Sequence, residues 1–144
     1  MEKRILPNEI LLAEAGALLA EGRDVELSVK GNSMLPFLRN ECDSVQLRKL
    51  PQVEKGDVVL AQIAPGRYVL HRVRAIEGER LTLMGDGNIR GTEACTTADV
   101  LGTAIAYIRP GGKRRKPGKA RLWQWLRPVR RYLLFIYRRI YKTA

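Results

Sequence analysis

Residues 68–84, YVLHRVRAIEGERLTLM, contain the clearest structural pattern of the chain. Apolar and polar residues alternate along most of Tyr68–Ile76 and again along Arg80–Met84, and Glu77-Gly78-Glu79 separates the two runs. Alternation of this kind is typical of strands that bury one face, and a short connection containing glycine favours a hairpin. The stretch therefore predicts two paired, antiparallel strands.

Further short runs rich in β-branched residues lie on both sides of this hairpin. They are Val25–Val29, Ser44–Arg48, Asp57–Ile63 and Val100–Ile108, and turn residues such as Gly56 and Pro65-Gly66 separate them. Many short strands with little helix between them favour a mainly β, antiparallel domain.

A short amphipathic helix is expected before the strands, from Pro7 to about Glu21. Pro7 suits a first helical turn, Gly22 suits a helix end, and apolar residues recur between them at helical spacing. Glu9 and Glu14 interrupt the run, which disfavours a secretory signal. No uncharged apolar run approaches the ~20 residues of a spanning helix. We therefore expect a cytoplasmic protein, soluble or peripheral at the inner membrane.

The net charge of +11 is confined to the end of the chain. Residues 111–144 contain twelve Lys or Arg and no Asp or Glu, whereas residues 1–110 have a net charge of −1. This asymmetry predicts a catalytic or binding domain over 1–110, a Pro/Gly-rich basic linker over 111–119 and a tail over 120–144.

The tail resembles an interfacial helix. Six of the nine aromatic residues lie in residues 121–142. A helical projection after Pro128 puts apolar side chains on one side and Arg131, Arg138 and Lys142 on the other; the apolar set is Val129, Tyr132, Leu133, Ile136, Tyr137 and Ile140, widened by Leu134 and Phe135. Such a helix favours an anionic membrane surface. Docking on its own domain or on a protein partner is the alternative, and nucleic acid is a weaker one.

Cysteine and histidine are too few to predict a metal or cofactor. Cys42 and Cys95 could form at most one disulfide, and neither has the spacing of a zinc site. His71 is the only histidine. We expect no cofactor.

One serine stands in a stretch that could carry chemistry. Residues 29–38, VKGNSMLPFL, contain Ser33, whose hydroxyl would need a base and oxyanion donors to attack a carbonyl. Strand alternation puts His71 on one face with Val69 and Val73, where it is suited to proton transfer. By itself, a single histidine in a strand is more often structural.

Two acidic residues could orient the imidazole. Asp86 lies in Gly85-Asp86-Gly87-Asn88, directly after the second hairpin strand, and Glu93 follows seven residues later. Either carboxylate could act as the third group of a triad. Asp86 could equally bond within its own loop, because Gly-Asp-Gly-Asn is a good turn sequence.

Five elements in order resemble the serine peptidases that include type I signal peptidases and LexA-type self-cleaving repressors. They are Gly31–Pro36 (GNSMLP), Lys55–Val59 (KGDVV), Val69–Val73 (VLHRV), Gly85–Asn88 (GDGN) and Asp99–Gly102 (DVLG). The resemblance covers roughly Val25 to Ile108. It implies the antiparallel β domain of that family and a serine endopeptidase.

The resemblance also implies roles for residues. Ser33 matches the nucleophile, and its backbone amide, with Asn32, would form the oxyanion hole. His71 matches the base of the archaeal and endoplasmic-reticulum-like branch, where other members use lysine. Glu93 is the first candidate for orienting His71, with Asp86 as loop former or alternative. Signal peptidases commonly have Ser-Gly before the nucleophile, where this chain has Gly31 and Asn32.

The resemblance implies a Ser/His peptidase, and with the basic tail we expect it to cut a leader or precursor peptide at or near a membrane surface. Two alternatives stay open. One is a catalytically degenerate binding protein whose basic tail contacts a membrane or a partner. The other is a LexA-like protein that cleaves itself, for which Ala15-Gly16 is a suitable bond type.

Overall fold

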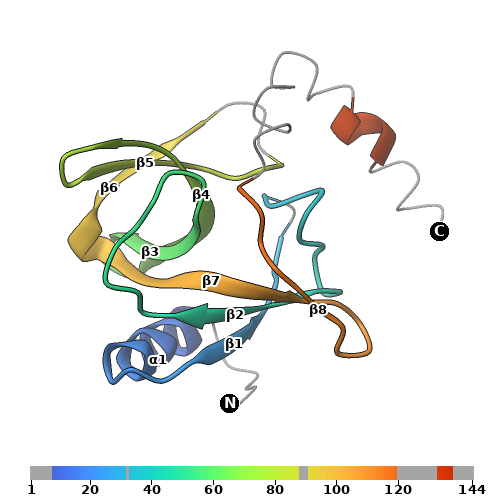
Figure 1. The fold of residues 1–144 in the computed structure, drawn as a ribbon, viewed down its shortest axis with the longest axis horizontal. Coiled ribbons are helices and arrows are strands. Elements are labelled where there is room, and N and C mark those ends of the chain that lie inside the picture. The colour runs from blue at the N-terminus through green and yellow to red at the C-terminus, as the bar shows by residue number, and fades with distance from the viewer. Residues whose placement is uncertain (1–7, 32, 88–90, 120–132, 138–144) are drawn as a thin grey trace.

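The computed structural model describes residues 8–31, 33–87, 91–119 and 133–137. Within these residues the strands form one antiparallel sheet in the order β1-β2-β7-β3-β4-β5-β6, with β8 paired to β7 (Figure 1). The elements are α1 (Asn8–Ala20), β1 (Val25–Ser28), β2 (Ser44–Arg48), β3 (Val58–Ala64), β4 (Arg67–Glu77), β5 (Arg80–Met84), β6 (Glu93–Thr96), the 3-10 turn η1 (Thr97–Asp99), β7 (Val100–Ile108) and β8 (Arg114–Arg115). The expectation of a mainly β, antiparallel domain is confirmed.

Strands β4 and β5 form the predicted hairpin. Glu77 lies opposite Arg80 and Arg72 lies opposite Met84. Gly78, in the connection, has a φ of +61°, a backbone conformation that glycine adopts without a steric penalty. On its other side β4 pairs with β3. The hairpin is therefore interior to the sheet.

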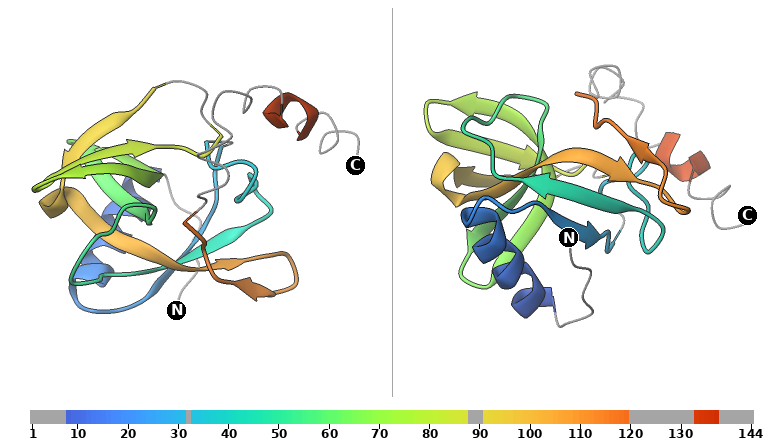
Figure 2. Two further views of the ribbon diagram at one scale, coloured as in Figure 1. Left: turned by 45° about the horizontal axis from the view of Figure 1, so that its top comes forward. Right: turned by 60° about the horizontal axis from the view of Figure 1, so that its bottom comes forward.

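Strand β3 is buried on both faces, which explains its unbroken apolar run. Val58 and Leu60 belong to a core formed with α1, β1 and β2, whereas Val59 and Ala61 belong to a second core with β5 and β6. Figure 2 shows α1 along one side of the sheet, beside β1. Antiparallel strands alternate when one of their faces meets solvent, which is not the case for Val58–Ala61.

The helix approaches β7 closely at Gly102. A Cβ atom on Gly102 would lie 2.9 Å from Cδ1 of Leu19, whose side chain is fully buried. The glycine of the Asp99–Gly102 motif therefore has a packing role, because it leaves room for α1.

Replacing Gly102 by alanine is expected to lower the free energy of unfolding by about 1–3 kcal/mol, the usual cost of overpacking a core. Urea denaturation measures this loss. In the double variant with Leu19→Ala, the total loss should be smaller than the sum of the two single losses, since the smaller side chain makes room. Strictly additive losses would contradict the close packing of Leu19 on Gly102.

The segment after β7 contacts the sheet and the turn before β3. Arg114–Arg115 pair with β7, and the Nζ atom of Lys119 lies 2.5 Å from Oδ1 of Asp57. Gly118 and Lys119 thus lie against the turn before β3. The predicted boundary between body and linker stays a prediction. Most of the predicted tail lies outside the described residues, as does Pro7 at the predicted helix start.

Among the residues that the structure describes, no helix has the length and apolarity needed to cross a membrane.

Candidate active site

The Ser33 loop connects β1 to β2 and is held by buried side chains. Met34, Leu35 and Leu38 are 2%, 1% and 0% exposed, and the amides of Phe37 and Leu38 both donate to the carbonyl of Met34 at 3.0 Å. Ser33 itself is half-buried. Its carbonyl accepts a hydrogen bond of 2.7 Å from the amide of Gly87. The loop is therefore anchored to the turn that follows β5.

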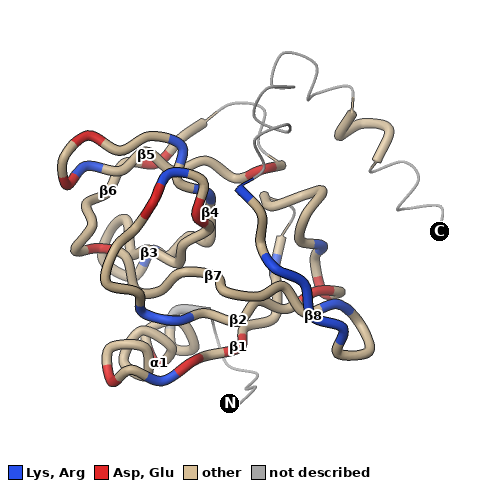
Figure 3. Tube along the Cα trace, viewed as in Figure 1, with Lys and Arg blue, Asp and Glu red and all other residues tan. Residues whose placement is uncertain are grey.

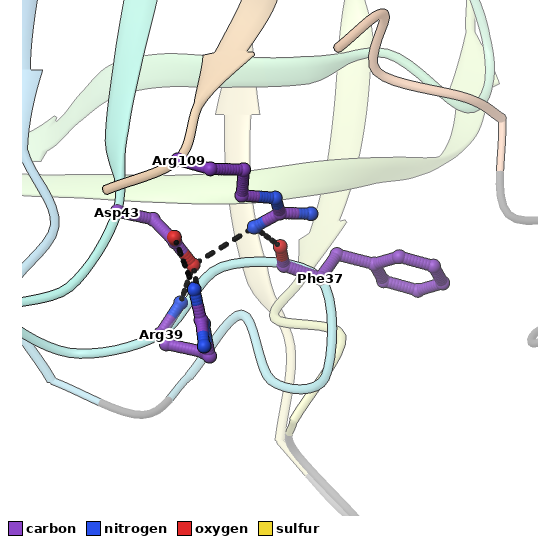
Figure 4. Close-up of polar contacts among 4 residues, drawn as sticks. All are labelled: Phe37, Arg39, Asp43 and Arg109. Carbon is purple, nitrogen blue, oxygen red and sulfur yellow. Dashed lines mark hydrogen bonds and ion pairs between the residues drawn. The ribbon is translucent and has the colours of Figure 1, made fainter. Parts of the chain in front are cut away.

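The buried carboxylate of Asp43 holds the other end of the Ser33 loop, directly before β2. Asp43 is 1% exposed and accepts hydrogen bonds from the side chains of Arg39 and Arg109 (Figure 4). One nitrogen of Arg109, Nη1, also donates to the carbonyl of Phe37 at 2.6 Å. Burial alone would raise the pKa of Asp43, but the hydrogen bonds from Arg39 and the charge of Arg109 lower it below its ordinary value of 3.8.

Replacing Asp43 by asparagine is expected to cost roughly 1.5–3 kcal/mol at neutral pH, the range for hydrogen bonds to charged groups. Because the folded-state pKa of Asp43 is lowered, its stabilisation is fully present above about 3.8 and disappears as the pH falls through the folded-state value. The stability difference between wild type and Asp43→Asn should therefore shrink in acid. Urea denaturation over a pH series measures it. A difference that stays constant in acid would contradict this role of Asp43.

The imidazole of His71 meets a carboxylate from another strand. Nδ1 of His71, on β4, pairs with Oε1 of Glu93, at the start of β6. Strand β5 lies between them: Val73 is opposite Leu83, and Leu83 is opposite Glu93. Since alternate residues share a face, His71 and Val73 point to the same side as this row.

The His71 and Glu93 side chains are sheltered, with 9% and 18% of their surface exposed. Within the described residues, Nε2 of His71 makes no hydrogen bond. A carboxylate on Nδ1 favours the tautomer with its proton there, which leaves Nε2 able to accept a proton. This arrangement suits a general base.

Asp86, the alternative candidate for orienting His71, pairs with Arg72 instead. Its two carboxylate oxygens each accept a hydrogen bond of 2.7 Å from Arg72, and both side chains are almost completely buried. Glu93, and not Asp86, contacts His71. Asp86 therefore belongs to a buried ion pair with Arg72, the residue that follows His71 on β4.

Arg72 joins the segments around the candidate site. Its Nη1 atom donates to the carbonyls of Gly56 and Gly118 at 2.7 Å each, and its guanidinium lies 5.5 Å from the ring centre of Phe37. Arg72 thus connects the Ser33 loop, the turn before β3, the turn after β5 and the segment after β8. Arg72 directly follows His71 in the chain, so these contacts also fix the position of β4 next to His71.

The structure does not join Ser33 to His71 by a hydrogen bond: among the described residues, none runs between Ser33 Oγ and the imidazole. Catalytic hydrogen bonds are often long without substrate and tighten when it binds. The Ser33 loop and the His71 strand are linked instead through Gly87, Asp86 and Arg72. Asn32, the other predicted oxyanion residue, lies outside the described residues.

Other nucleophiles and ligands are less well placed. Neither cysteine forms a disulfide, and burial raises the pKa of the Cys95 thiol, which disfavours the reactive thiolate. No group of three potential metal ligands occurs in the described part of the chain. The Ala15-Gly16 bond lies within α1, with Ala15 only 2% exposed, so the helix would have to unfold before this bond could be cut.

Sequence reasoning missed Arg39, Asp43 and Arg109. The spacing of Arg39 and Asp43 is a weak signal for a local pair, but nothing in the sequence connects either to Arg109, sixty-six residues after Asp43.

A scan against models of known protein families and a search of curated proteins found no match to this chain. The likeness to signal peptidases and LexA-type proteins therefore rests on the five ordered motifs.

Proposed function

We propose that the protein is a serine endopeptidase with Ser33 as nucleophile, His71 as general base and Glu93 as the group that orients His71. The observation that carries this proposal is the pairing of His71 Nδ1 with Glu93 Oε1, since it leaves Nε2 for a proton. The order of the motifs supports a second proposal, that the β domain has the fold of signal peptidases and LexA-type proteins.

The chemistry follows from these roles. Nε2 of His71 removes the Ser33 proton as Oγ attacks the peptide carbonyl, and the Ser33 amide, with Asn32, stabilises the oxyanion. His71 then gives the proton to the leaving amine. Water, activated by the same imidazole, releases the acyl group. Glu93 stabilises the imidazolium that forms in each step.

We expect the substrate to be an extended leader or precursor peptide. Strand β1 is at one end of the sheet and leads directly into the Ser33 loop, so a peptide added to that edge could present its carbonyl to Ser33. The family resemblance implies small residues before the cleaved bond. We place the reaction at or near a membrane surface because the basic, aromatic tail favours anionic lipid.

A binding protein without catalysis is the second candidate. The lack of a hydrogen bond between Ser33 and His71 among the described residues favours it, as do Gly31 and Asn32 before the serine. Such a protein would bind the same extended peptides without cutting them.

Digestion of a complex peptide mixture separates the two candidates. Wild-type protein is incubated with the peptides of a proteome digest, and new termini are identified by mass spectrometry. We expect a shared pattern of cleavage in wild type and Thr97→Ala, a control that removes an exposed hydroxyl in η1, and none above background in Ser33→Ala. Peptide binding with identical termini in all three samples would favour the binding protein.

A further inference from the structure

The described part of the tail packs against the Ser33 loop. Residues 133–137 form a helical turn, red in Figure 1, and Leu134 in this turn clusters with Leu35. Each of these leucines is 1% exposed, and Phe37 and Tyr137 pack around them. Leu35 is two residues after Ser33. The tail is therefore docked beside the candidate nucleophile.

The other side of this turn is apolar and exposed. Phe135 is 63% exposed, Ile136 is 53% exposed and Leu133 is 37% exposed. The helical projection grouped Leu133 and Ile136 with Tyr137, but the contact with Leu35 selects Leu134 and Tyr137 as the inner side. A helical turn that is apolar on both sides normally has a second surface to cover it.

The charge of the sequence that contains this turn indicates which surface that is. Residues 111–144 contain twelve Lys or Arg and no Asp or Glu, and the four cations Lys113–Lys116 are all exposed, along β8 in Figure 3. In the sequence, Arg130 and Arg131 precede this apolar turn and Arg138 and Arg139 follow it, a combination that matches the interface of an anionic bilayer. Nucleic acid would satisfy the cations but would leave the apolar side exposed.

We propose that the helical turn of residues 133–137 binds an anionic lipid bilayer, with Leu133, Phe135 and Ile136 inserted among the acyl chains. The contact between Leu134 and Leu35 then holds the Ser33 loop at the bilayer surface. Gly118, which precedes the tail, accepts a hydrogen bond from Arg72, so described residues on both sides of 120–132 contact the surroundings of the candidate site. The further consequence, that scissile bonds lie close to the membrane, rests on the proposed peptidase activity.

Vesicle binding by the full chain tests the lipid contact. We expect the protein to sediment with phosphatidylglycerol-containing vesicles more strongly than with phosphatidylcholine alone, and less strongly in high salt. Both tryptophans, Trp123 and Trp125, lie in the tail and would be quenched by brominated lipids. Equal binding to neutral vesicles, or binding to an oligonucleotide but not to vesicles, would overturn the proposal.

Substitutions on the exposed side make the test specific. The double variant Phe135→Ser with Ile136→Ser should bind anionic vesicles on the order of a hundredfold more weakly, as expected for two large apolar side chains removed from an interface. Ile10→Ser is the matched control, because Ile10 is 59% exposed on α1, and its affinity should equal that of wild type. Equal losses in both would overturn the assignment of this surface.

Hydrogen exchange tests the coupling to the loop without any substrate. Vesicles should slow exchange of the Phe37 and Leu38 amides in wild type. Leu134→Ala should remove this slowing while the variant still sediments with vesicles. If exchange in the loop does not respond to vesicles, the coupling is wrong even if peptides are cut. If both readouts behave as expected and no peptide is cleaved, the peptidase proposal fails and the membrane contact stands.

Discussion

Replacing His71 by alanine is expected to lower kcat for peptide cleavage by roughly 10³- to 10⁶-fold, the range for loss of a base that acts as a unit with its nucleophile. The Glu93→Gln substitution should lower kcat by roughly 10²- to 10⁴-fold, since glutamine can contact the imidazole but cannot stabilise its charge. KM should change little in either variant because neither group holds the substrate in this account.

The matched control for Glu93→Gln is Glu77→Gln. Glu77 is an exposed residue at the end of β4, the strand that contains His71. The Glu77→Gln variant should cleave at the wild-type rate. Steady-state kinetics on a peptide found in the digest measure all three variants. If His71→Ala retained more than about a tenth of the wild-type kcat, a base other than His71 would be required.

Removing Asp86 is expected to cost about 3–5 kcal/mol of folding free energy, since Asp86→Ala leaves the Arg72 guanidinium buried without its counter-ion. Arg72 is 2% exposed and Asp86 is 0% exposed. Replacing both partners, with Arg72→Met and Asp86→Leu, should recover much of that loss, because no buried charge then remains unpaired. Urea denaturation of the three proteins measures these differences.

The chain contains an exposed pair of similar geometry as a control. Arg48 donates to Asp24 at 2.8 and 2.9 Å, but the Arg48 side chain is 52% exposed. Arg48→Ala should therefore cost no more than about 1 kcal/mol, because it removes only the exposed partner and Asp24 keeps its hydrogen bond from Gln46. Equal losses for Arg48→Ala and Asp86→Ala would contradict the structural importance of the buried pair.

The sequence predicted the elements whose signals are local. Alternation across a short connection predicted β4 and β5, and helical spacing before Gly22 predicted α1. It missed β6 and β8. Glu93–Thr96 has no apolar alternation and becomes a strand by pairing with β5, and Arg114–Arg115 pair with β7 although the surrounding glycines and prolines indicate a linker.

In the candidate site too, the sequence predicted what depends on local motifs and missed what depends on contacts between distant segments. Motifs in the sequence identified Ser33, His71 and Glu93 as candidates. The choice between Glu93 and Asp86 needed the structure, because it depends on which strand pairs with β5 and on where Arg72 points. Alternation along β4 puts Arg72 on the face opposite His71 but contains no information about the partners of its guanidinium. The role of Asp43 in holding the Ser33 loop was unpredictable because it depends on Arg109, at the end of β7.

The most direct test of the central claim is a crystal structure with a peptide aldehyde derived from the best-cleaved sequence. The account predicts a covalent bond between the aldehyde carbon and Ser33 Oγ, with Nε2 of His71 about 2.6–3.2 Å from Oγ or joined to it through one water. Glu93 should remain on Nδ1. An aldehyde bound beside an unmodified Ser33, or an imidazole beyond the reach of one water, would contradict the account.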